Sequence, residues 1–153
     1  MPECRLEKRS ICTASESDTE AFGAVVGRRI TGATCISLTG PLGSGKSVLA
    51  RGICSGLGVK EPVISPTFIL YQEYRARLTV VHCDLYRLEH EQELEDLGLF
   101  ERIGDVVVLV EWGDRSPRIH QRADVVMGLE ITGASTRRIS VSYGAPASAL
   151  FGE

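Results

Sequence analysis

The stretch GPLGSGKS at residues 40–47 decides the fold, because it matches every fixed position of the pattern G-x-x-x-x-G-K-[ST]. The residues before it, 34–39, form a strand-like run, and residues 48–57 carry apolar side chains at helical spacing. A glycine-rich turn between a strand and a helix lets backbone N–H groups converge on phosphate oxygens, aided by the positive end of the helix. The sequence therefore predicts a phosphate-binding loop, called the phosphate loop below.

Two side chains of the phosphate loop carry its chemistry. Lys46 adds a full positive charge for phosphate, and the hydroxyl of Ser47 is placed to bind Mg²⁺. The residues predicted to surround the phosphates are Gly40, Leu42, Gly43, Ser44, Gly45, Lys46 and Ser47.

Length and composition predict one ordinary globular domain. The chain has 153 residues, 43% hydrophobic and 24% charged, with a net charge of −3. This balance does not suggest a protein that binds nucleic acid by itself. We expect a single domain over residues 1–153, with its ordered core at about 15–143 and loosely held ends.

The cysteines and the hydropathy predict a cytoplasmic protein. The five cysteines are odd in number and never spaced as C-x-x-C, so neither a zinc site nor a disulfide framework is expected. No stretch has the length and apolarity of a signal peptide or of a membrane-spanning helix.

The remaining patterns predict an α/β fold with a mixed sheet. A helix is expected after residue 15, started by a capping box of Ser17 with Glu20. Residues 68–84 and 125–143 each read as a hairpin, and 89–97 as an acidic helix. The continuous apolar run 106–110 indicates a strand covered on both faces, as in the centre of a parallel sheet.

Carboxylates follow two of the predicted strands. Glu111 directly follows the apolar run, so it lies at the carboxyl end of a central strand, where ligands of open α/β sheets bind. It could hold Mg²⁺ or orient a water molecule. Asp84 ends the other strand and could be a second metal ligand or a catalytic base. His82 shares its strand face and reads as a core residue or a support for the site.

Other residues allow two readings each. Thr67 follows a Ser-Pro pair and could sense the terminal phosphate, or could simply start a strand. Trp112 either packs or anchors a partner. Arg115, Arg118 and Arg122 lie in a polar segment that we expect to be a loop; it is either solvated or the lid of a small-molecule kinase.

The composition of the chain narrows the identity of the nucleotide base that the site would bind. Classical GTPases read guanine with an Asn-Lys-x-Asp loop, and this chain contains no asparagine. Adenine is therefore the better expectation.

Four segments together resemble the TsaE (YjeE) family of bacterial P-loop ATPases. They are the phosphate loop followed by Arg51-Gly52, then Ser65-Pro66-Thr67-Phe68, then residues 82–88 (HCDLYRL), then Glu111-Trp112. The resemblance runs from about residue 15 to about residue 143. It implies a three-layer P-loop NTPase fold with a mixed, mostly parallel sheet, and a function in forming threonylcarbamoyladenosine in tRNA.

The resemblance also implies cofactors, partners and roles. ATP and Mg²⁺ would be bound, the protein would act with the TsaB and TsaD proteins, and tRNA would be reached only through that complex. Because the chain has no obvious arginine finger of its own, we expect weak hydrolysis without these partners. Lys46 would serve catalysis, Ser47 and Glu111 would hold Mg²⁺, and Asp84 and Thr67 would support hydrolysis. Glu16 and Thr19 would lie near the base or ribose.

The chain departs from the family pattern at two positions of the phosphate loop. The family usually has an acid where this chain has Pro41, and a threonine where it has Ser47. The serine keeps the hydroxyl, so metal binding should survive. Pro41 removes a charge and an N–H group, which leaves its part in the loop open.

Overall fold

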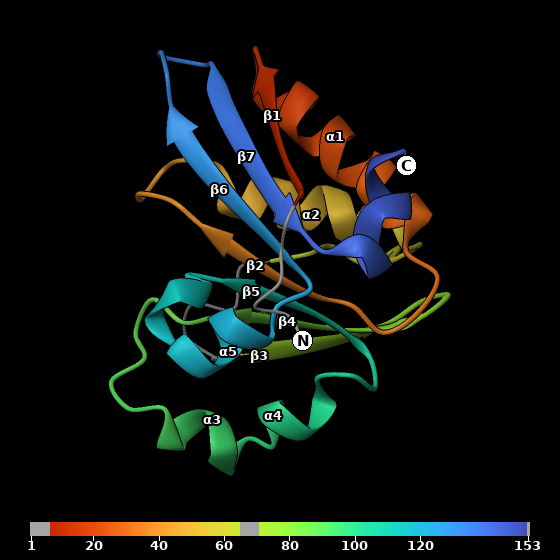
Figure 1. The fold of residues 1–153 in the computed structure, drawn as a ribbon, viewed down its shortest axis with the longest axis vertical. Coiled ribbons are helices and arrows are strands. Elements are labelled where there is room, and N and C mark those ends of the chain that lie inside the picture. The colour runs from red at the N-terminus through yellow and green to blue at the C-terminus, as the bar shows by residue number, and fades with distance from the viewer. Residues whose placement is uncertain (1–6, 65–70, 153) are drawn as a thin grey trace.

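The computed structural model describes residues 7–64 and 71–152, whose strands form one seven-stranded sheet (Figure 1). The strand order across the sheet is β1-β7-β6-β2-β5-β4-β3. In chain order the strands are β1 (Glu7–Thr13), β2 (Cys35–Thr39), β3 (Tyr71–Arg75), β4 (Thr79–Asp84), β5 (Val107–Glu111), β6 (Val125–Ile131) and β7 (Arg137–Tyr143).

The sheet has a parallel centre and antiparallel edges. β2 pairs in parallel with both β5 and β6, and β5 pairs in parallel with β4. The hairpins β3–β4 and β6–β7 are antiparallel, and β1 pairs antiparallel with β7. The predicted mixed sheet and both hairpins are confirmed. Because β2, β4 and β5 run the same way, their carboxyl ends meet at one edge of the sheet.

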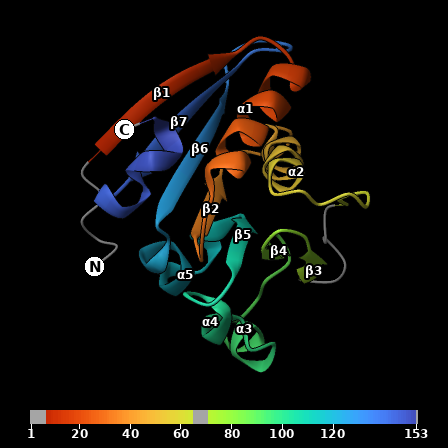
Figure 2. The ribbon, with the colours of Figure 1, turned by 90° about the vertical axis from the view of Figure 1, so that its right-hand side faces the viewer.

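Helices cover both faces of this sheet, which gives three layers (Figure 2). Figure 2 shows α1 and α2 on one side of the central strands and α3, α4 and α5 on the other. The helices are α1 (Glu16–Arg29), α2 (Lys46–Gly56), α3 (Gln92–Asp96), α4 (Leu99–Arg102), η1 (Gly113–Arg115), α5 (Pro117–Arg122) and η2 (Ala145–Phe151), of which η1 and η2 are 3₁₀-helices. No helix within residues 7–64 and 71–152 has the length and apolarity needed to cross a bilayer.

Strand β5 contributes alternate side chains to two separate cores. Val107 and Leu109 pack with α1 and α2, whereas Val108 and Val110 pack with α3, α4 and α5. All five of its residues are buried. The prediction that this apolar run is covered on both faces is therefore confirmed.

Helices α1 and α2 touch backbone to backbone through glycines. A Cβ added at Gly52 would lie 2.2 Å from the carbonyl oxygen of Glu20, and one added at Gly27 would lie 2.2 Å from that of Ile53. Gly23 and Gly56 are also confined by backbone atoms of the opposite helix, at 2.6 Å and 2.2 Å from such a Cβ. Glycine is required here because any side chain would separate the two helices.

The helix α1 begins with a different cap from the one predicted. The N-cap is Ser15, whose Oγ accepts the N–H of Asp18 at 3.1 Å, while Oδ2 of Asp18 accepts the N–H of Ala14 at 3.0 Å. Ser17 with Glu20 has a similar spacing, but Glu20 forms an ion pair with Arg51 of α2 at 3.0 Å. This ion pair engages the Glu20 carboxylate that the predicted capping box would have used.

The ends of the chain are more ordered than predicted. β1 pairs with β7 along its whole length, although its exposed polar side chains give no strand pattern in the sequence. At the other end, η2 lies beside α1 (Figure 1), buries Leu150 and Phe151, and stacks Phe151 on Tyr143 with ring centroids 4.5 Å apart. The expectation of a loose start and a frayed end was wrong for these residues.

The predicted acidic helix at 89–97 is shorter than expected. It covers only Gln92–Asp96 in α3, and Leu94 is its buried residue. Leu97, which follows the helix, is 38% exposed. Gly98 at φ 72° then separates α3 from α4.

Candidate nucleotide-binding site

The phosphate loop connects the end of β2 to the start of α2, as predicted. Gly40, Gly43 and Gly45 have φ values of 140°, 79° and 103°, which only glycine adopts without strain. A Cβ at Gly40 would also meet the carbonyl oxygen of Leu129 at 2.6 Å. The loop glycines therefore set the backbone path that leads into the N-terminus of α2.

Lys46 is folded back over the loop. Its Nζ donates to the carbonyl oxygens of Gly40 at 2.7 Å and Pro41 at 2.9 Å, and it lies 3.9 Å from the centroid of the Trp112 ring. Burial lowers the pKa of Lys46, and the nearby carboxylates of Glu111 and Asp84 oppose that shift. Pro41 thus contributes its carbonyl, which also accepts the N–H of Ser44 at 3.1 Å.

A hydrogen-bonded row joins the phosphate loop to the central strands. Oγ of Ser47 donates to Oε1 of Glu111 at 2.7 Å, and Oε2 of Glu111 lies 2.6 Å from Nε2 of His82. His82 and Glu111 are 0% and 2% exposed. Nδ1 of His82 is buried and has no hydrogen-bond partner within the described residues, so the tautomer that fits carries its proton on Nε2 and donates it to Glu111.

Asp84 lies beside Glu111 at the same edge of the sheet. The two residues are register partners in the parallel pair β4–β5, and both are buried. Oδ1 of Asp84 accepts the N–H of Tyr86 at 2.9 Å. The structure therefore brings the two predicted carboxylates together next to Ser47.

These groups line one pocket of about 600 Å³. Its walls are the start of α1, the phosphate loop, the ends of β4 and β5, and the turn between β6 and β7. Of the predicted site residues, the lining includes Glu16, Thr19, Leu42, Gly43, Gly45, Lys46, Ser47, Asp84 and Glu111. Gly40 and Ser44 are not among the lining residues, and Thr67 lies outside the described residues.

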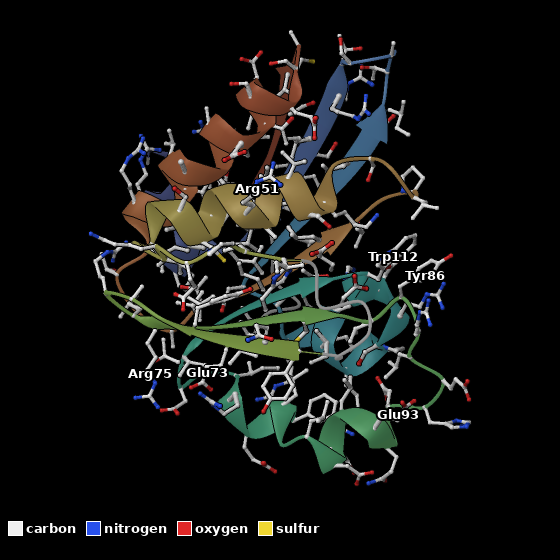
Figure 3. All side chains as sticks on the ribbon, turned by 180° about the vertical axis from the view of Figure 1, so that it is seen from behind. Arg51, Glu73, Arg75, Tyr86, Glu93 and Trp112 are labelled. Atoms are coloured by element: carbon white, nitrogen blue, oxygen red, sulfur yellow. The ribbon has the colours of Figure 1, made fainter. Side chains whose placement is uncertain are left out.

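An aromatic pair forms one wall of the pocket (Figure 3). The rings of Trp112 and Tyr86 have centroids 5.1 Å apart, and the guanidinium of Arg115 lies over both. Trp112 has φ 59°, the only positive φ of a non-glycine residue in the described part of the chain. A bulky residue in this conformation is strained, and such strain concentrates at functional sites.

The segment after Glu111 is helical, contrary to prediction. Ser116 caps α5 by accepting the N–H of Ile119, Pro117 occupies the first turn, and Ile119 is fully buried. A Ser-Pro pair before a buried residue is a helix-start signal that the arginine content concealed.

The arginines of this segment do not form the lid that a small-molecule kinase would need. Arg118 forms an ion pair with Glu95 at 2.6 Å and lies over the ring of Phe100, on the α3–α4 side of the sheet. Arg122 donates to the carbonyl oxygen of Phe100 at 3.3 Å. Only Arg115 of the three contacts pocket residues within the described structure.

Arg137 is a pocket residue that the sequence reading missed. Its side chain lines the pocket and donates to the carbonyl oxygens of Gly43 and Ser44. Its position just after the turn of the β6–β7 hairpin carries no sequence signal for this contact. Only the sheet order, which places β6 beside β2, brings it to the loop.

Comparison with known proteins agrees with this geometry. Residues 13–139 match the family model of the threonylcarbamoyl adenosine biosynthesis protein TsaE. This chain belongs to the TsaE family. The family match spans α1, the phosphate loop and the strand ends that form the pocket.

Individual TsaE relatives cover most of the chain. The tRNA threonylcarbamoyladenosine biosynthesis protein TsaE of Treponema pallidum is 36% identical over 129 residues, which are 84% of this chain and 96% of that protein. The TsaE protein of Aquifex aeolicus is 30% identical over 136 residues, 87% of this chain and 95% of the relative. The crystal structure of Bacillus subtilis YdiB superposes with a TM-score of 0.77 over 95% of this chain and 92% of that one, at 23% identity, which shows the same fold.

Proposed function

We propose that this TsaE family member binds and hydrolyses ATP as a component of the machinery that forms threonylcarbamoyladenosine in tRNA. The observation that carries the proposal is the hydrogen bond from Ser47 to Glu111, which joins the phosphate loop to a buried carboxylate. Family membership supports the pathway. The TsaB and TsaD proteins are the partners that the family resemblance suggests.

Phosphate binding falls to the loop and the start of α2. The N-terminus of α2 and the N–H groups of the loop glycines favour a polyphosphate, and Lys46 adds a full charge. In the structure, Nζ of Lys46 donates hydrogen bonds to the carbonyl oxygens of Gly40 and Pro41. A bound phosphate is a stronger acceptor, so we expect Lys46 to turn toward it.

The residues present suit Mg²⁺, which takes oxygen ligands and commonly uses one or two carboxylates together with substrate phosphates. Ser47, Glu111 and Asp84 would hold it, with His82 fixing the orientation of Glu111 through its Nε2 hydrogen bond. A bound Mg²⁺ would neutralise charge on the phosphate oxygens. The hydrogen bond between Ser47 and Glu111 keeps these two oxygen ligands 2.7 Å apart beside the loop.

Hydrolysis needs a group that orients water at the terminal phosphate. Asp84 lines the pocket beside Glu111, and we assign it this role as water-orienting group or base. Thr67 stays a predicted helper, since it lies outside the described residues. Glu16 and Thr19 line the pocket at the start of α1, where we place the adenine base or ribose.

Hydrolysis by the protein alone should be slow. Arg137 and Arg115 contact pocket residues, and each guanidinium already has partners. Arg137 is bonded to main-chain carbonyls, and Arg115 lies over aromatic rings. An arginine supplied in trans speeds many phosphoryl transfers, so TsaB and TsaD should raise the rate.

Two variants and one control test the ATPase. With Mg²⁺, Lys46→Ala should lose ATP binding, and Glu111→Gln should keep binding while its hydrolysis rate falls on the order of 100-fold. Glu130→Gln is the matched control, because Glu130 is an exposed carboxylate on β6. Full hydrolysis by Glu111→Gln would exclude the magnesium and catalytic role of that residue. Brisk hydrolysis that TsaB and TsaD leave unchanged would exclude partner dependence.

The pathway is tested by nucleoside analysis. Depletion of the protein in its host should lower threonylcarbamoyladenosine in tRNA, measured by mass spectrometry of digested tRNA. Wild-type protein should restore the nucleoside, and Lys46→Ala should not. Unchanged threonylcarbamoyladenosine after depletion would rule out the proposed function.

A further inference from the structure

Arg137 ties the β6–β7 turn to the phosphate loop. Its Nε donates to the carbonyl oxygen of Ser44 at 3.1 Å and its Nη2 to that of Gly43 at 3.2 Å. Its Nη1 donates to the carbonyl oxygens of Gly133 at 3.1 Å and Thr136 at 2.8 Å. One planar guanidinium therefore holds two successive peptide groups of the loop against a hairpin of the sheet.

Holding these carbonyls fixes the direction of the loop N–H groups. A trans peptide unit is planar, so its N–H points opposite to its C=O. With the carbonyls of Gly43 and Ser44 facing Arg137, the N–H groups of Ser44 and Gly45 point away from it. The N–H of Ser44 bonds within the loop to Pro41, whereas Gly45 is the N-cap residue of α2, so its N–H lies at the N-terminus of that helix.

The loop needs such a restraint from outside. Gly43 has φ 79°, and a Cβ built on it would meet no atom within 4 Å, so packing does not confine this residue. Leu42 beside it is 73% exposed. Glycine residues lose the most conformational freedom on ordering, and a bonded carbonyl lowers that cost before the ligand arrives.

The charge of Arg137 also remains available to the pocket. Its hydrogen-bond partners within the described residues are main-chain carbonyls, which carry no net charge. Arg137 lines the pocket together with Lys46. A second positive charge therefore faces the space where a polyphosphate would lie.

We propose that Arg137 is a positioning residue of the phosphate loop, which it holds ready for the β- and γ-phosphates of a nucleotide through the carbonyls of Gly43 and Ser44. This inference rests on the proposed ATP-binding function. It assigns a role to a residue of β7, outside the loop and outside the acidic strand ends.

The next residue of the same strand is a matched control. Arg138 points to the other face of the sheet and pairs with Glu130 at 3.7 Å, both side chains being about half exposed. Arg138→Gln removes the same charge from the same strand without touching the loop.

Isothermal titration calorimetry with ATP and AMP tests whether Arg137 acts on binding of the β- and γ-phosphates. Arg137→Gln should weaken ATP binding about tenfold, the size expected for losing hydrogen bonds from a charged donor, while AMP binding changes less than about twofold. Arg137→Lys should recover only part of the loss, because lysine restores the charge but not the planar fork. Arg138→Gln should bind both nucleotides as the wild type does.

The outcomes are distinct. Equal ATP affinity of Arg137→Gln and Arg138→Gln would overturn the inference and leave the proposed function intact, as would an equal loss of ATP and AMP affinity in Arg137→Gln. Full recovery of ATP affinity by Arg137→Lys would show that the positive charge, and not the hydrogen bonds to the loop carbonyls, accounts for the effect of Arg137. If the wild type and Arg138→Gln bound no ATP, the proposed function would fail and the inference with it.

Discussion

Trp112 has a strained backbone conformation, and its ring contacts Lys46 of the phosphate loop. Its backbone lies in the left-handed region, and its N–H bonds to the carbonyl of Leu38 at 2.8 Å, which fixes the end of β5 against β2. Gly113 follows so closely that a Cβ there would meet Oγ of Ser37. This backbone hydrogen bond helps to hold Glu111 and the indole near Lys46.

The position of Trp112 also predicts a change in intrinsic fluorescence when a nucleotide binds. It is the single tryptophan of the chain, and Nζ of Lys46 lies 3.9 Å from its ring. If Lys46 turns to a phosphate, this contact is lost and the emission of the indole changes. Titration with ATP should shift the intrinsic fluorescence of the wild type. Lys46→Met should show no ATP response, and a wild-type spectrum that ATP leaves unchanged would contradict a move of Lys46.

Single residues were predictable where the sequence placed them at strand ends. Glu111 and Asp84 follow recognisable strands, so the sequence brings them to one edge. The buried contact of His82 with Glu111 needs the register of β4 against β5, which no local pattern encodes. Arg137 was missed for the same reason, since its partner is a loop 93 positions away in the chain.

At the scale of elements, α1 and α2 are in close backbone contact. Gly52→Ala would place a methyl group 2.2 Å from the carbonyl oxygen of Glu20, and neither backbone can yield without separating the helices. We expect a loss of about 3 kcal/mol in the free energy of unfolding, near the upper end for overpacked sites. Urea denaturation measures it.

Gly32→Ala is the control for this prediction. A Cβ at Gly32 meets nothing within 4 Å, and its φ lies outside the left-handed region, so its stability should change by less than about 0.5 kcal/mol. Equal stability of the two variants would show that the helices can move apart at little cost.

Elements were predictable when their burial followed a simple period. β5 is apolar throughout because both faces are covered, and the β6–β7 hairpin has a clear turn. β1 was missed because β7 holds it mainly through backbone pairing, with polar side chains in water. α5 was missed because its single fully buried side chain, Ile119, lies among charged residues.

At the scale of the whole molecule, burial of cysteine thiols predicts how stability depends on pH. Burial, with a smaller effect of Glu111, raises the pKa of Cys54 from 9.0 to about 12. Below pH 9 the thiol is protonated in both states and has no effect. Between pH 9 and pH 12 the Cys54 thiol loses its proton in the unfolded state and keeps it in the folded state. Cys54 therefore lowers the free energy of unfolding by at most about 1.4 kcal/mol per pH unit.

Urea denaturation at alkaline pH tests this behaviour. Cys54→Ala should show a shallower decline than the wild type above pH 9, and Cys83, whose pKa burial also raises, should account for a further part. Cys12→Ala removes an exposed thiol and should keep the wild-type slope. Identical slopes for Cys54→Ala and the wild type would show that Cys54 ionises alike in both states.

The glycine contacts between α1 and α2 also limit how the pocket can change shape. Ser15, Glu16 and Thr19 at the start of α1 face the same pocket as the start of α2. Because the two helices touch through their backbones, we expect these two walls to keep a constant separation when a nucleotide binds. We therefore expect nucleotide exchange to depend on movement of Tyr86 and Trp112, and partner proteins that alter exchange to act on that wall.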